Sequence, residues 1–166
     1  AVAANNVTIG NTASISTSGN VTLTATAGAI SETGATLGKI LGAALLTTNS
    51  ATGQTLNGAN TVASFNGTNS TSGNVALTNT AGTLTVTGIT ETLAGNIAVV
   101  NTGNVTSTGT ISTGNNGNIG ITATNGTLTA NAGITANGTG TVNLSATGGT
   151  NDVLINAAVA STSGNV

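Results

Sequence analysis

The sequence predicts an all-β protein, a right-handed parallel β-helix in the form of a triangular β-solenoid. Three observations predict it: a Gly-Asn-Val/Ile-x-apolar block recurs at nearly constant intervals, apolar residues alternate with Thr, Ser and Asn, and each interval holds three apolar peaks. Alternation with a period of two is typical of a strand with one buried face. Since stacked repeats bury a shared core, we expect about 22 residues per coil, one coil being one turn of the chain, and roughly seven coils in residues 1–166.

The composition supports a repetitive β structure rather than an ordinary domain or a disordered chain. Charged residues make up 2% of the 166 residues, and His, Cys, Met, Trp, Tyr and Pro are absent. A hydrophobic content of 37% and a net charge of −2 do not fit disorder, which usually combines low hydrophobicity with high net charge. Thr, Asn and Gly are weak helix formers. The one segment in which we expect a short helical turn is Lys39–Leu46, KILGAALL.

The intervals between blocks set the length of one coil. The first apolar residue of the block recurs at a nearly constant spacing in the second half of the chain, at Val75, Ile97, Ile119, Val142 and Val166. The interval from Val21 to Val75 is more than twice as long, and we interpret it as two coils with extra residues. The extra residues are assigned to an irregular coil or insertion at about 36–57, within a single solenoid segment.

Each coil is expected to contain three strands, with Gly and Asn at the turns between them. One coil, for example, contains Ile119/Ile121, then Leu128, then Ile134. The predicted core consists of the apolar residues of the recurring blocks: Val21, Leu23, Val75, Leu77, Ile97, Val99, Ile119, Ile121, Val142 and Leu144.

The Asn of each block is expected to lie above its counterpart in the neighbouring coil. Stacked side-chain amides can donate to one another along the axis, which would form a structural ladder. The alternative is that Asn merely tolerates the turn conformation. The predicted ladder residues are Asn20, Asn74, Asn96, Asn118 and Asn165.

The two ends of the chain read as parts of one block. Val166 followed by Ala1 gives GNVAVAANNVTIG, and counting through this join places Val21 close to one coil after Val166. The chain is therefore expected to be either one unit of a tandem array or an excerpt of a longer solenoid.

No catalytic, cofactor or metal site is expected. General acid–base catalysis needs positioned titratable groups, and the three acids, Glu32, Glu91 and Asp152, lie far apart in the sequence. Soft-metal ligands are absent, and the single basic side chain, Lys39, does not make a nucleic-acid surface. Glu32 and Lys39 are interpreted as two solvated charges, with an ion pair as the alternative. Membrane insertion is not expected either.

Rows of threonine allow one further hypothesis. Thr22, Thr24 and Thr26, and likewise Thr83, Thr85 and Thr87, would point outward from a flat sheet. Such arrays resemble those of ice-binding solenoids, although these rows do not recur in every coil.

Three segments carry a family resemblance: Gly19–Thr33 (GNVTLTATAGAISET), Leu56–Phe65 (LNGANTVASF) and Gly73–Gly88 (GNVALTNTAGTLTVTG). They resemble the repeats of filamentous-haemagglutinin-like exoproteins, which bacteria export by two-partner secretion. The resemblance implies a parallel β-helix shaft, passage through an outer-membrane transporter, a secreted or cell-surface location, and a role in adhesion or biofilm. The family's Asn-Pro motifs cannot occur in a chain without Pro, and no Arg-Gly-Asp motif is present.

The function expected from the sequence is therefore the structural shaft of an extracellular bacterial fibre, which associates with itself end to end or laterally. An adhesin module that binds host or matrix glycans or proteins is the alternative. Ice binding ranks below both, and a β-helix enzyme lacks the necessary residues.

Overall fold

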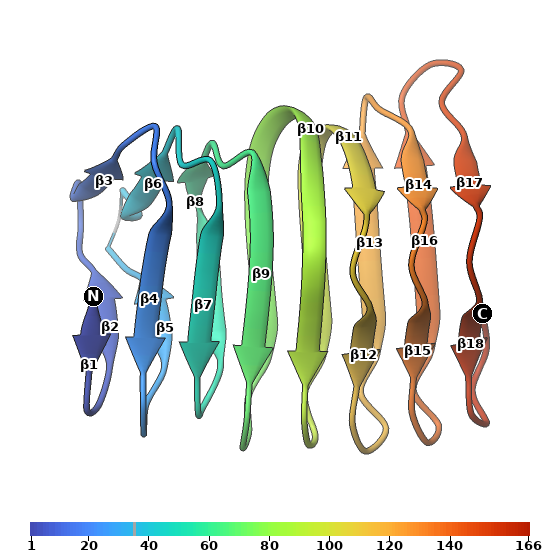
Figure 1. Cartoon of the computed structure of the whole chain (residues 1–166), viewed down its shortest axis with the longest axis horizontal. Coiled ribbons are helices and arrows are strands. Elements are labelled where there is room, and N and C mark those ends of the chain that lie inside the picture. Colours follow the sequence, from blue (N-terminus) through green and yellow to red (C-terminus); the bar gives the residue numbers. More distant parts are fainter. Residues whose placement is uncertain (35) are drawn as a thin grey trace.

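The structure is a computed structural model that describes residues 1–34 and 36–166. The described residues form 18 strands, and the short helical turn expected at Lys39–Leu46 is not formed. The strands stack side by side along one axis as a β-solenoid of about seven turns (Figure 1). No described segment is a helix that could cross a membrane.

The strands line three faces of the coil. Face 1 contains β1 (Val2–Ala3), β4 (Val21–Ala25), β7 (Leu46–Ser50), β9 (Ser64–Asn69), β12 (Ile111–Thr113), β15 (Ile134–Ala136), β18 (Val159–Ser161) and the end of β10. Face 2 contains β2 (Val7–Ile9), β5 (Ile30–Glu32), β8 (Gln54–Asn60), β13 (Ile119–Thr124), β16 (Val142–Thr147) and the starts of β10 (Val75–Glu91) and β11 (Ile97–Ser107). Face 3 contains β3 (Ser14–Ser16), β6 (Lys39–Leu41), β14 (Leu128–Ala130), β17 (Val153–Ile155), the middle of β10 and the end of β11.

All the strand pairs are parallel, and the register confirms the predicted coil length. On face 2, Val75 pairs with Ile97, Ile97 with Ile119, and Ile119 with Val142. In Figure 1 the chain runs down the near side and up the far side while it advances from the N-terminus to the C-terminus. This is the right-handed coil that parallel crossovers favour.

The core is a continuous column of apolar side chains inside the coils. Nine of the ten predicted core residues are buried, and Leu144 is partly buried against the same cluster. Phe65, the one aromatic residue, is fully buried in β9. Since side chains alternate across each strand, the buried residues of β13 are Ile119, Ile121 and Ala123.

The predicted helical turn at Lys39–Leu46 is wrong. Lys39–Leu41 is strand β6, which pairs with β3, and Leu46 begins β7. Ile40 and Leu46 are fully buried. Strand pairing on both sides of this segment outweighs its local preference for a helix, which is a weak determinant in a short segment.

The interpretation of the interval from Val21 to Val75 is also wrong, because the two residues lie on different faces. Val21 pairs with Leu46 on face 1, whereas Val75 pairs with Ile97 on face 2. The block marks a turn followed by a strand, and such turns occur at more than one corner of the coil. The region 36–57 holds β6, β7 and the start of β8, all in parallel pairs. The coils here are uneven: the step from Val21 to Leu46 is longer than the step from Val75 to Ile97, and the step from Leu46 to Phe65 is shorter.

Val166 and Val21, which the join of the two chain ends placed one coil apart, also lie on different faces. The carbonyl of Asn165 accepts a hydrogen bond from the amide of Val142, which begins β16. Val166 therefore lies next to β16, on face 2. Val21, which the join placed one coil away, lies on face 1.

Candidate functional site: the stacked corners of the solenoid

The predicted asparagine ladder exists over three coils, with a different donor from the one expected. The Asn74 side-chain oxygen accepts from the backbone amide of Asn96 at 2.9 Å and from its side-chain nitrogen at 3.3 Å. The Asn96 oxygen accepts from the Asn118 amide at 2.8 Å. The side chains therefore mainly cap backbone N–H groups of the next coil, which the turn would otherwise leave unpaired.

The other predicted ladder residues do not extend this row through their side chains. Thr141 stands where the next Asn would be, and its amide and hydroxyl both donate to Asn118. Asn165 lies one coil beyond Thr141, and it is its backbone carbonyl that accepts a hydrogen bond, from the Val142 amide. Asn20 precedes β4 on face 1 and lies outside the row.

The same capping recurs at other corners, which the sequence analysis missed. Side-chain oxygens of turn asparagines accept from a backbone amide one coil later. The pairs are Asn6 with Ala29, Asn11 with Thr36, Asn104 with Thr127 and Asn116 with Thr139. The sequence carries a signal for these pairs, because the two residues of each pair are 23 to 25 positions apart, which is close to the length of one coil.

The glycines of the recurring blocks form a second row, for which close packing is the main reason. A Cβ atom added at Gly95 would overlap the carbonyl oxygen of Gly73, and one at Gly117 would overlap that of Gly95. Gly140 and Gly164 repeat the relation. Only Gly73 of this row has a positive φ, at 89°. Glycine is therefore needed here because each coil lies directly on the backbone of the one before it.

Buried asparagines form a third row, at the corner between faces 2 and 3. The Asn79 side chain accepts from the Val62 amide at 2.8 Å and donates to the Val62 carbonyl at 3.0 Å. Asn101 makes the same pair of bonds to Ala81 and accepts from Asn79 at 2.9 Å. The β10–β11 pairing shifts register between Thr80 and Thr83, so the Asn101 side chain bonds the backbone of Ala81 where the bulge interrupts the ladder.

Each buried Asn continues the inward-facing alternation of its strand, as in Val75-x-Leu77-x-Asn79 and Ile97-x-Val99-x-Asn101. A polar residue that repeats one coil later at an inward position is the signal that sequence analysis overlooked. In the following coil Ala123 takes this position and pairs with Asn101.

Two of the three acids, Glu32 and Glu91, are buried at the corners. For Glu32 this contradicts the expectation of a solvated charge. Glu91 accepts from the side-chain nitrogen of Asn69 at 2.6 Å, and Asn69 in turn accepts from the Ser50 hydroxyl at 2.8 Å. Ser50, Asn69 and Glu91 occupy neighbouring positions of one row on face 1.

Glu32 is the less completely hydrogen-bonded of the two acids. One carboxylate oxygen accepts from the Gly58 amide at 2.6 Å and from the Asn60 side chain at 3.1 Å. The other oxygen is buried and has no partner among the described residues. Burial raises the pKa of Glu32, and the bonds from Gly58 and Asn60 oppose that rise only in part. Among the residues that the structure describes, Lys39, the predicted alternative partner, is not paired with it.

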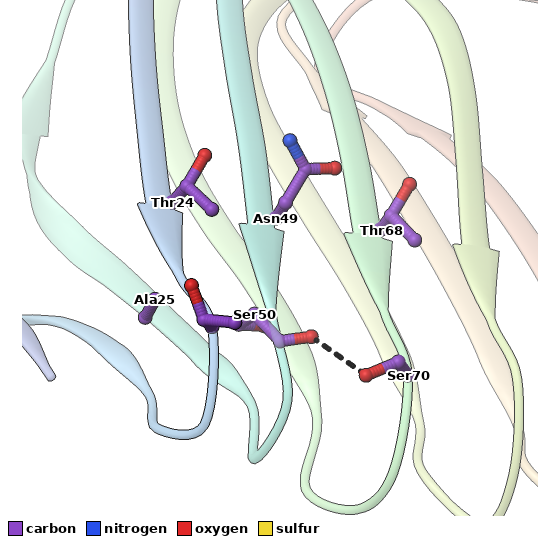
Figure 2. A pocket seen from close by; sticks show the side chains of 7 residues that line it. Thr24, Ala25, Asn49, Ser50, Thr68 and Ser70 are labelled. Atoms are coloured by element: carbon purple, nitrogen blue, oxygen red, sulfur yellow. Dashed lines mark hydrogen bonds between the residues drawn. The ribbon is translucent and has the colours of Figure 1, made fainter. Parts of the chain in front are cut away.

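Two shallow hollows lie on the surface of the described residues. One lies on face 1 and is lined by Thr24, Asn49 and Thr68 of successive strands, with Ser50 and Ser70 below them (Figure 2). The Ser70 hydroxyl donates to the Ser50 carbonyl at 3.4 Å. The other hollow is lined by Asn74 and Asn96 of the asparagine row and by Asn116 of a neighbouring turn. Neither is lined by an acid or a base, so both offer only neutral hydrogen-bonding groups.

The threonine rows are ordered along the axis in part. On face 1, Thr24 pairs with Asn49, Asn49 with Thr68, and Thr68 with Thr90. On face 2, Thr80 pairs with Thr102, and Thr102 with Thr124, which makes an unbroken row that the sequence analysis did not identify. Of the second predicted set, Thr83 and Thr85 pair with Asn104 and Thr106 on face 3.

Within the part of the chain that the structure describes, no group of three or more acidic, His or Cys residues could hold a metal ion. Comparison with known proteins gives no relative: no family model, no curated protein and no solved structure matches this chain. The function is therefore inferred from the molecule itself.

Proposed function

We propose that this segment is a structural shaft of an extracellular bacterial surface fibre, without catalytic activity. The observation that supports the proposal best is the unbroken stacking: parallel pairing links successive described coils along one axis, and one buried core runs from Ile9 to Val142. A stack of this kind extends a chain in one direction, at about 4.8 Å per coil, and can be lengthened by adding coils.

The polar residues of the segment support a structural role. The asparagine row and the buried asparagines each connect one coil to the next, rather than forming a site open to a ligand. The Glu91 side chain and one oxygen of the buried Glu32 side chain accept hydrogen bonds from amide groups of neighbouring coils. Residues that would serve catalysis in an enzyme serve coil-to-coil hydrogen bonding here.

Secretion to the cell surface belongs to the same proposal. It is supported by the resemblance of three segments to filamentous-haemagglutinin-like repeats, and the absence of Cys would allow the chain to cross a membrane unfolded. In this proposal the outer-membrane transporter is a partner during export, and the folded shaft then holds other parts of the protein away from the cell.

Immunogold electron microscopy of cells that express the full-length protein tests the proposal. Antibodies against this segment are expected to label fibres along their length, and removal of residues 1–166 is expected to shorten the fibre by about 34 Å at the usual strand spacing. Fibres of unchanged length that no longer attach to host or matrix surfaces would contradict the shaft and support an adhesin module.

A further inference from the structure

Face 2 presents a flat array of small side chains over consecutive coils. The outward residues of β10, β11 and β13 fall into three columns parallel to the axis. The first column has Ala76, Ala98 and Gly120, the second has Thr78, Val100 and Thr122, and the third has Thr80, Thr102 and Thr124. We call these nine residues the face 2 array. Val100, at its centre, is 39% exposed.

No charged side chain points outward from this array. Of the four charged residues, Glu32 and Glu91 are buried, while Lys39 and Asp152 lie in or next to strands of face 3. Two copies of face 2 can therefore approach each other without like-charge repulsion and without desolvating an ion.

The three columns differ in size in a way that suits a second copy. A two-fold axis parallel to the solenoid axis, placed between two facing arrays, puts the first column of each copy opposite the third column of the other. The Ala and Gly positions then face the Thr side chains, and Val100 lies close to its counterpart. Small opposite large is the arrangement by which facing sheets interdigitate.

The area of face 2 limits the affinity of one copy for another. Face 2 strands of six residues are about 20 Å long, and about five stacked coils with such strands extend about 24 Å along the axis. The face therefore offers about 500 Å² per copy. A standard stable interface buries about 800 Å² per partner. One segment would therefore pair weakly, and affinity would grow with the number of coils in contact.

We propose that face 2 is a lateral contact surface between two copies of this chain, which pair side by side with parallel axes. The inference rests on the proposed function, since it names the face by which shafts would associate into a thicker fibre. Parallel pairing suits shafts that extend from the same surface, because both copies point in the same direction.

Sedimentation equilibrium of the purified chain, at concentrations up to about 1 mM, measures the pairing. The average mass is expected to rise with concentration toward twice the monomer mass. Val100→Lys puts two like charges opposite each other and is expected to weaken pairing at least about tenfold. Thr90→Lys places the same charge on face 1 and is the matched control, which should pair as the parent chain does.

Circular dichroism checks that each variant is folded, and Thr102→Lys replaces Val100→Lys if the latter does not fold. Since the chain has no cysteine, disulfide formation between Ala98→Cys and Thr102→Cys chains tests the arrangement. Mixed dimers are expected to form faster than Ala98→Cys homodimers.

Monomers at every concentration, or a dimer that Val100→Lys and Thr102→Lys leave intact, would overturn the inference. Monomers that slow ice growth would do so as well, and would assign the array to ice. Labelled fibres one shaft thick would refute the lateral pairing and leave the proposed shaft standing, so the two failures are distinguishable.

Discussion

At the scale of single residues, the glycine row shows how little space separates the coils. Gly95→Ala places a methyl group against the carbonyl of Gly73 and the carboxylate of Glu91, and the sheet must move to accommodate it. We expect a loss of about 1–3 kcal/mol in the free energy of unfolding, measured by urea denaturation. Gly82→Ala is the control, because nothing lies within 4 Å of a Cβ at that position. Equal effects of the two substitutions would contradict direct stacking.

The buried and the exposed asparagines should differ in their contribution to stability. Asn79→Ala leaves the amide and carbonyl of Val62 without partners inside the protein, at a cost of about 1–3 kcal/mol for each unsatisfied group. Asn96→Ala removes an exposed acceptor that water can replace, and should cost about 0.5–1 kcal/mol. Denaturation of both variants under the same conditions checks the order, and a larger loss for Asn96→Ala would show that the exposed row dominates.

The buried carboxyl of Glu32 should make stability depend on pH. Its pKa is raised by burial, so the folded chain keeps the proton at pH values where the unfolded chain has lost it. The free energy of unfolding is therefore expected to be highest below the ordinary carboxyl range and to fall as the pH rises through the raised pKa.

Thermal unfolding at a series of pH values, compared with Glu32→Gln, measures this contribution. The variant should lose the fall in stability, whereas Asp152→Asn, at an exposed position, should keep it. Stability that rises with pH in the parent chain and not in Glu32→Gln would reverse the assigned sign.

At the scale of strands and coils, the unit that can be removed is one complete turn. Deletion of residues 97–118 joins Asn96 to Ile119 and lets Val75 pair with Ile119, since both residues pair with Ile97 at present. The shortened chain is expected to fold in one cooperative transition, with a proportionately smaller dependence on urea.

The matched control removes β11 alone, residues 97–107. It deletes fewer residues, but it removes the part of β11 on face 2 and the part on face 3. Every later strand would then have to pair on a different face from the one it occupies now. We expect this variant to lose most of its stability. A control as stable as the whole-coil deletion would mean that the coils do not stack in register.

The sequence predicted the elements of the second half well, and for a physical reason. From Val75 to Val142, strand, turn and coil length repeat together, so one count of residues fixes the face of every strand. Around Val21 the same block stands at a different corner, and the steps are uneven: the step from Val21 to Leu46 is longer than the regular coil, and the step from Leu46 to Phe65 is shorter. Counting cannot follow such changes, because only the pairing partner determines the face.

The candidate site was predicted less completely. The exposed row at Asn74, Asn96 and Asn118 follows from the repeat, but the direction of its hydrogen bonds depends on turn geometry that the sequence does not specify. The burial of Glu32 could not be inferred from its neighbours in sequence. Its partners, Gly58 and Asn60, are 26 and 28 residues away in the next coil.

At the scale of the whole molecule, the low charge and the three flat faces have one consequence. The described coils can be extended or laid side by side without charge repulsion, and specificity must then come from the shape of the faces. This is why the face 2 array, rather than any titratable group, is the part of the surface on which an association would depend.

The central claim, that residues far apart in the sequence stack in one row along an axis, is tested most directly by distances between spin labels. Thr24, Asn49, Thr68, Thr90, Ser112 and Thr135 follow one another along face 1, and the chain has no cysteine to compete for the label. With Thr24 labelled in every pair, electron–electron resonance should give distances that grow by about 4.8 Å per coil, reaching about 24 Å at Thr135. Distances that do not increase in this order, or that do not grow by a nearly equal step from one coil to the next, would contradict the β-solenoid.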